Sequence, residues 1–107
     1  MRIQDLSYAG GESAPTEIKQ MVRWLRTSAQ EGEAEAQHYL GKLLNGGDGI
    51  PQNTTLAYAW LSVAVASGYD KARLLRDEIA QNLSPVALDK GQALAAKYFE
   101  KYQPSSP

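Results

Sequence analysis

Apolar residues recur along the chain at helical spacing in five separate segments. In the first segment Ile18, Met21, Val22 and Leu25 follow the i, i+3, i+4, i+7 rule that is typical of one face of an α-helix. Each of the other segments carries a comparable apolar stripe. The pattern predicts helices over residues 16–30, 33–45, 54–67, 69–82 and 84–102.

Glycines and capping residues mark where these predicted helices begin and end. Gly32 and Gly68 follow the first and third helices, and glycine commonly ends a helix because it adopts the left-handed conformation without strain. Asn53 stands at the N-cap position of the third helix. Ser84 stands at the N-cap of the fifth, with Pro85 at the first helical position. These boundary signals agree with the apolar periodicity.

Composition and charge favour an all-α protein and exclude several classes. The 107 residues include 15 Ala and 12 Leu but 1 Phe, and alanine and leucine are among the strongest helix formers. The net charge of −1 argues against a nucleic-acid partner, because such proteins carry strongly basic surfaces. The absence of Cys excludes disulfides and thiolate metal sites. No stretch is apolar enough to predict membrane insertion.

The chain length is that of about one domain. Glycines and Pro15 interrupt any periodicity in residues 1–15, for which we predict a flexible lead-in. A helical domain is predicted over 16–102 and a disordered tail over 103–107. The location is unknown from the sequence: as printed it has no export signal, which is consistent with a cytoplasmic protein. A periplasmic location would require an export signal that had been removed.

Two parts of the chain repeat each other at an offset of 36 residues, where Trp24-Leu25 recurs as Trp60-Leu61. A helix, a glycine stop and a second helix therefore occur twice, with their apolar stripes in phase. Such αα-hairpins bury their apolar faces by stacking into a solenoid. We expect the Trp and Leu residues to fill the interfaces between hairpins. We expect Gly41 to admit a neighbouring helix or ring, because a glycine inside a helix is otherwise costly.

A set of motifs in the middle of the chain carries a family resemblance. The motifs are Ala36-Gln37-His38-Tyr39-Leu40-Gly41, Gly47-Asp48-Gly49-Ile50, and then Asn53, Ala57, Trp60, Ala64, Gly68 and Ala72. This combination resembles the Sel-one-like repeat family, a variable-length relative of tetratricopeptide repeats, over roughly residues 16–83. The resemblance implies a right-handed αα-hairpin solenoid of about five helices. It also implies a non-enzymatic protein–protein interaction module, since the family usually serves as adaptor or scaffold in bacterial and eukaryotic proteins.

The sequence departs from the family pattern where a further repeat would continue. Arg76 and Asp77 stand 36 residues after Leu40 and Gly41, so the fourth predicted helix lacks the next stacking face. Repeat arrays need a terminal unit with a polar outer face. We therefore predict that residues 84–102 form a C-terminal capping helix whose apolar stripe packs on the fourth helix.

Residue types that support catalysis or metal binding are few. Glu35 and His38 have the i, i+3 spacing of a di-iron half-site, but no second such motif occurs and His38 is the only histidine. The glycine-rich loop at 46–49 lacks the Lys-Ser/Thr pair and the preceding strand of a phosphate-binding loop. We therefore expect no catalytic residues, no metal and no cofactor.

A polar stripe on the second predicted helix has a counterpart on the fourth, 36 residues later. The first helices of successive hairpins line the concave side of a solenoid, so we predict that an unidentified protein partner contacts this face. Leu74 is expected to be partly exposed there and to act as an apolar anchor. The predicted concave face consists of Glu35, His38, Lys42, Lys71, Leu74 and Glu78. The alternative is that these residues form ordinary solvated helix surfaces.

Two other functional interpretations stay open. The exposed face of the N-terminal hairpin can stack weakly on a second copy, or on further repeats of a longer chain, which would make the segment structural. A more remote alternative is hydrolase-type activity, because cysteine-rich relatives in the family have been linked to penicillin binding. This chain has no cysteine and lacks the groups that such an activity needs.

Overall fold

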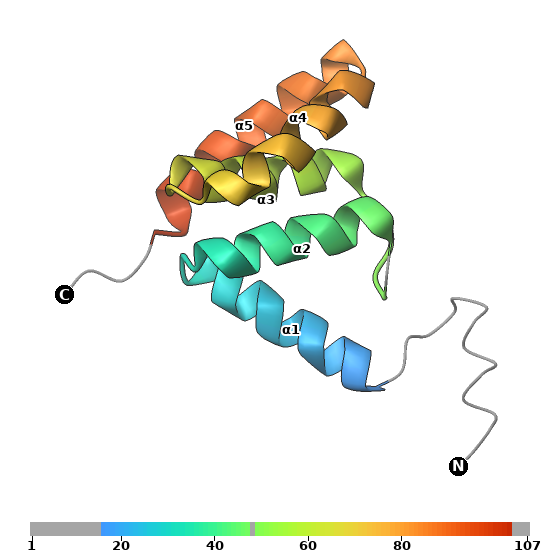
Figure 1. Cartoon of the computed structure of the whole chain (residues 1–107), viewed down its shortest axis with the longest axis vertical. Coiled ribbons are helices and arrows are strands. Elements are labelled where there is room, and N and C mark those ends of the chain that lie inside the picture. Colours follow the sequence, from blue (N-terminus) through green and yellow to red (C-terminus); the bar gives the residue numbers. More distant parts are fainter. Residues whose placement is uncertain (1–15, 48, 104–107) are drawn as a thin grey trace.

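The computed structural model describes residues 16–47 and 49–103. This part of the chain contains five α-helices, one 3₁₀ turn and no strand (Figure 1). The elements are α1 Thr16–Gln30, α2 Ala34–Gly46, α3 Thr54–Ala66, η2 Asp70–Ala72, α4 Arg73–Asn82 and α5 Pro85–Lys101. The predicted all-α class is confirmed. The lead-in predicted at 1–15 lies outside the described residues, as does the predicted tail apart from Gln103.

The predicted helix ends are confirmed by their hydrogen bonds and dihedral angles. The Asn53 side chain accepts a hydrogen bond from the backbone N–H of the residue three positions on, at 3.0 Å, and caps α3. The Ser84 hydroxyl accepts the equivalent bond at 3.1 Å and caps α5. Gly32 and Gly68 have φ values of 93° and 98°, so both occupy the left-handed region as their equivalent repeat positions predict.

Helix α3 is the centre of the packed structure. It contacts α2 on one side and α5, η2 and α4 on the other, while α1 packs against α2 (Figure 1). The core follows this order: its buried apolar members come from α1, α2, α3, η2 and α4, and Tyr98 of α5 packs against them while partly buried. The buried core cluster is Leu25, Ala29, Ala36, Leu40, Leu44, Ala57, Trp60, Leu61, Ala64, Ala72 and Ile79.

Two glycines allow α3 to lie very close to its neighbours. A Cβ atom at Gly41 of α2 would lie 2.7 Å from Leu61 Cγ of α3, nearer than a real Cβ contact. A Cβ atom at Gly91 of α5 would lie 2.7 Å from Tyr58 Cδ2, also of α3. The expectation that Gly41 admits a neighbouring helix is therefore confirmed, with Leu61 as the side chain that it admits.

The capping helix packs on a different neighbour from the one predicted. Its start at Pro85 and its end at Lys101 agree closely with the predicted range. Its main contacts, however, are with α3, and it makes little contact with α4. The close approach at Gly91 explains the difference: because glycine has no side chain, the backbone of α5 packs directly on Tyr58 of α3.

The two tryptophans differ in burial although they occupy equivalent repeat positions. Trp60 is 5% exposed, and its ring centroid lies 4.8 Å from that of Tyr98 and 5.6 Å from that of Tyr102. Trp24 is 64% exposed, so the expectation that it fills an interface is wrong. The positions of α3 that correspond to the two tyrosines of α5 are a serine and an alanine, which offer Trp24 no ring to stack against.

The helix predicted over 69–82 is interrupted near its start. Gly68 turns the chain sharply, and Tyr69 follows with a non-helical backbone at φ −91° and ψ 83°. The next residues, Asp70–Ala72, form a 3₁₀ turn, and the α-helix begins only at Arg73. A tight i→i+3 turn is the common way for a chain to enter a helix after such a reversal.

Candidate interaction surface

Five of the six residues of the predicted concave face are exposed, and His38 is half-buried. Glu35, His38 and Lys42 lie along α2 at i, i+3 and i+7, which places them on one side of that helix. Leu74 and Glu78 lie on α4, whereas Lys71 belongs to η2 and not to the helix. The stripe on α2 is therefore regular, and its counterpart bends where η2 meets α4.

His38 lies where α2 approaches η2. Its ring centroid is 5.3 Å from that of Tyr69, which directly precedes η2. Partial burial lowers the pKa of His38, and the charges of Lys42 and Lys71 lower this pKa further. Both ammonium groups therefore act on the imidazole, and the fold brings together three residues that are up to 33 positions apart in sequence. We call His38, Lys42 and Lys71 the basic end.

The basic end is bordered by aromatic surface. The ammonium nitrogen of Lys42 lies 5.5 Å from the ring centroid of Tyr39, within the range of a cation–π contact. Tyr39 is itself exposed, and Tyr69 is half-buried. Aromatic rings with a polar group supply large contact area at low entropic cost, so they are common in recognition surfaces.

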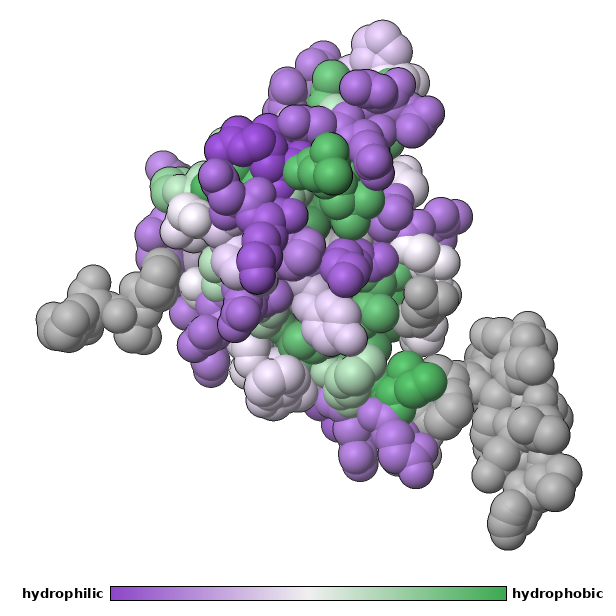
Figure 2. Space-filling model, viewed as in Figure 1, coloured by the Kyte–Doolittle hydropathy of each residue, from purple (hydrophilic) through white to green (hydrophobic). Residues whose placement is uncertain are grey.

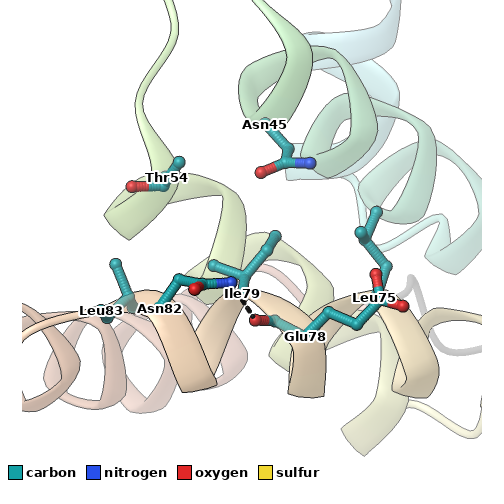
Figure 3. A pocket seen from close by; sticks show the side chains of 7 residues that line it. All are labelled: Asn45, Thr54, Leu75, Glu78, Ile79, Asn82 and Leu83. Atoms are coloured by element: carbon teal, nitrogen blue, oxygen red, sulfur yellow. Dashed lines mark hydrogen bonds between the residues drawn. The ribbon is translucent and has the colours of Figure 1, made fainter.

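A pocket of about 230 Å³ opens between α4, the C-terminal end of α2 and the first residue of α3. Figure 3 shows Asn45 and Thr54 facing the side chains of α4 across this space. Apolar surface comes from Leu75, Ile79 and Leu83. Polar groups come from the other four residues. The complete lining, which we call the apolar pocket, is Asn45, Thr54, Leu75, Glu78, Ile79, Asn82 and Leu83.

The apolar pocket and the basic end adjoin each other along α2. Asn45 of the pocket follows Lys42 by three residues on α2, so the two lie on adjacent turns of that helix, and on the opposite side Leu75 of α4 follows Lys71 of η2 by four residues. We call the surface that the basic end and the apolar pocket form together the α2–α4 groove. Figure 2 shows apolar surface over α4 surrounded by hydrophilic surface on the face in view.

The remaining predicted residues differ in how they join the groove. Glu78 lines the apolar pocket, and the side-chain amide of Asn82 donates a hydrogen bond to its backbone carbonyl at 3.0 Å. Leu74 does not line the pocket, but its predicted exposure is confirmed at 73%. Glu35 is exposed one turn before His38, and among the described residues no side-chain hydrogen bond or ion pair joins it to the others.

Sequence reasoning missed most of the pocket lining. Asn45 and Asn82 each continue a predicted stripe by one further turn, so helical spacing from Lys42 and from Glu78 could have found them. No sequence signal of this kind marks Thr54, because its position in the pocket depends on the tertiary fold of the loop between α2 and α3. Leu75 lies half-buried, packed against the core and lining the pocket.

The described residues hold no group of three His, Cys, Asp or Glu side chains that could bind a metal ion. None of the helices in residues 16–47 and 49–103 has the length and apolar character needed to cross a bilayer. The groove offers one imidazole, two ammonium groups, amides and an apolar cavity. This chemistry suits non-covalent recognition of a chain segment.

Comparison with known proteins identifies the architecture. No protein-family model matches the sequence, and no curated protein matches it. Among solved structures, the chain is similar to c5321, a protective antigen present in uropathogenic Escherichia coli strains that displays an SLR fold. The TM-score is 0.78 at 24% sequence identity, over 92% of this chain and 21% of that chain. The chain has the SLR fold.

The SLR fold is the Sel-one-like repeat architecture that the sequence motifs resemble. The predicted αα-hairpin solenoid is therefore confirmed. The chain spans about a fifth of the length of the antigen, so the likeness concerns a short run of helices within a longer protein. Stacked helical repeats of this kind typically serve as interaction scaffolds, because their curvature creates an extended concave surface.

Proposed function

We propose that this SLR protein is a non-enzymatic protein–protein interaction module whose α2–α4 groove receives the partner. The observation that carries the proposal is the apolar pocket, which is lined by the half-buried Leu75 and Leu83 and by the buried Ile79. Leu74, 73% exposed on the same helix, adds apolar surface beside it. A partner side chain that entered the pocket would bury this surface.

The groove combines an apolar anchoring surface with separate charged residues, as is expected of a recognition site. Binding energy concentrates in a few desolvated anchors, and the pocket together with Leu74 supplies surface for such an anchor. Charges at the rim of an interface mainly set the association rate and the specificity. Lys42 and Lys71 are exposed and lie outside the pocket lining, and they have that role in the proposal.

The test is a selection of peptides from a random phage-displayed library against the whole protein. Enriched peptides are then synthesised and titrated against the parent and against a Lys42→Glu, Leu74→Ala double variant. We expect the double variant to bind at least about tenfold more weakly, with its melting temperature nearly unchanged, because both side chains are exposed. The matched control is Lys90→Glu with Val86→Ala, which makes the same two kinds of change on the exposed side of α5.

The control should bind the selected peptides as the parent does. If the control variant loses binding while the groove variant keeps it, the partner surface lies on α5 and the groove proposal is wrong. If the library yields no peptide that binds the parent specifically, the groove is ordinary solvated surface.

The exposure of Trp24 favours a second candidate function, in which α1 stacks on another copy of the chain. Trp24 and the neighbouring Met21 are both exposed on α1. Large apolar side chains of this kind mark surfaces that are covered in an assembly. Sedimentation velocity at rising concentration should then show an oligomer that Trp24→Lys abolishes and Val86→Lys does not. A parent that remains monomeric throughout contradicts this function.

A further inference from the structure

The basic end carries positive charge that the described part of the protein does not neutralise. Two ion pairs occur among the described residues, Arg73 with Asp70 and Arg76 with Asp77, at 3.0 and 2.9 Å. Neither uses Lys42 or Lys71. Asp70 of η2 and Asp77 of α4 are thus paired with arginines, while Lys42, Lys71 and Glu78 form no ion pair among the described residues.

The lowered pKa of His38 also reflects the positive charge of the basic end. A nearby carboxylate would favour the imidazolium form of His38 and raise its pKa. All the causes acting on His38 lower its pKa instead, with burial the largest and the two lysines next. The two lysines thus contribute positive charge near the imidazole, whose ring centroid lies 5.3 Å from that of Tyr69, the residue that precedes η2.

The apolar pocket differs from the basic end in kind. Its lining contains one acidic residue, Glu78, and no basic residue. Along α4 the pocket centres near Glu78 and Ile79, seven to eight residues beyond Lys71. With about 2.0 Å of rise per residue in η2 and about 1.5 Å in α4, the path from Lys71 to Glu78 along the two elements is about 11 Å. An extended peptide covers this distance in about three residues, at about 3.3 Å each.

From these observations we infer that the α2–α4 groove recognises an extended acidic peptide, in which an apolar side chain enters the apolar pocket and a carboxylate about three residues away contacts Lys42 and Lys71. The inference rests on the proposed function and specifies its partner. Aspartate or glutamate supplies the carboxylate, and a leucine-sized side chain matches a pocket of about 230 Å³ that is open on one side.

The same charges disfavour a polyanion. Two lysines and one histidine can balance one or two carboxylates, whereas nucleic-acid surfaces present a long basic stripe. Glu78 lies further along the groove and would repel a phosphate backbone that continued past the basic end. The ligand is therefore short and carries its negative charge at one end.

The test uses the whole ¹⁵N-labelled protein and three synthetic peptides. The first is an acetylated, amidated peptide of sequence Gly-Glu-Glu-Ser-Gly-Leu-Gly. The second replaces both Glu by Gln, and the third replaces Leu by Ala. We expect the first peptide to shift the amide signals of Lys42, Lys71 and Asn82, and its affinity to fall as the salt concentration rises. Each replacement should weaken binding about tenfold.

The protein variants separate local charge from net charge. Lys42→Glu with Lys71→Glu should abolish binding of the first peptide and favour a peptide in which both Glu are replaced by Lys. The control, Lys90→Glu with Lys97→Glu, makes the same net change with two exposed lysines of α5, and it should bind the first peptide as the parent does. Circular dichroism checks that both variants keep the parental helix content.

Two results would overturn the inference. If the Glu and Gln peptides bind equally, the basic end does not select carboxylates. If the first peptide shifts signals of α1 or α5 instead of those in the groove, the ligand site is elsewhere. Should library-selected peptides still need the groove while the Glu and Gln peptides bind alike, the proposed function stands and the acidic specificity alone is wrong.

Discussion

Replacing each tryptophan by alanine tests the fold at two equivalent repeat positions with opposite burial. Trp60→Ala removes a side chain that is 5% exposed and stacked on two tyrosines of α5. Truncation of a buried Trp costs about 3–5 kcal/mol, and loss of the aromatic pairs is part of that cost. Trp24→Ala removes a side chain that is 64% exposed, and it should cost less than about 1 kcal/mol.

Urea denaturation followed by circular dichroism measures both variants on the same two-state basis. A domain of this size loses about 4–8 °C of melting temperature for each kcal/mol, so Trp60→Ala should melt at least about 12 °C below the parent or fail to fold. Low protein concentration keeps any self-association through α1 out of the comparison. A Trp60→Ala variant within about 1 kcal/mol of the parent would refute the packing of α5 on α3, and so would an equal loss in Trp24→Ala.

Three further measurements address single contacts. Gly41→Ala should lower the free energy of unfolding by about 1–2 kcal/mol, because overpacking outweighs the gain in helix propensity. Gln37→Leu should cost about 1–2 kcal/mol, since the buried Gln37 amide donates to the Ala29 carbonyl at 3.0 Å; an unchanged urea midpoint would contradict this. NMR titration should place the pKa of His38 below 6.5, and Lys71→Ala should raise it only part of the way, because burial is the larger cause. The unfolded chain then binds the proton more tightly, so the contribution of His38 to stability is present above pH 6.5 and is lost as pH falls through the folded pKa.

Helix positions followed from the sequence because local signals agree with one another. The apolar period, the Asn53 and Ser84 caps and the paired glycines all locate the same boundaries, and each is a property of a few neighbouring residues. The 3₁₀ turn at Asp70–Ala72 escaped this reasoning, because apolar spacing is similar in a tight turn and in the first turn of an α-helix.

The candidate site followed from the sequence only in part, because it combines residues of two hairpins. The repeat offset placed His38, Lys42 and Lys71 on related faces, and the structure brings their charges together. The apolar pocket depends on the separation between α4 and the facing ends of α2 and α3. No local pattern encodes that separation, so Asn45 and Thr54 could be assigned to the pocket only from the tertiary structure.

The small contact between α4 and α5 has a cause in the repeat itself. Gly41 and Leu61 bring α2 and α3 into close contact, and 36 residues later these positions are Asp77 and Lys97, both exposed. Two charged, hydrated side chains cannot reproduce the close contact of a glycine with a leucine. Asp77 was predicted to remove a stacking surface from the fourth helix. In agreement, α4 makes little contact with α5. Because α5 packs on α3 instead, α4 is held mainly by one neighbour, and the pocket lies on the side where it is free.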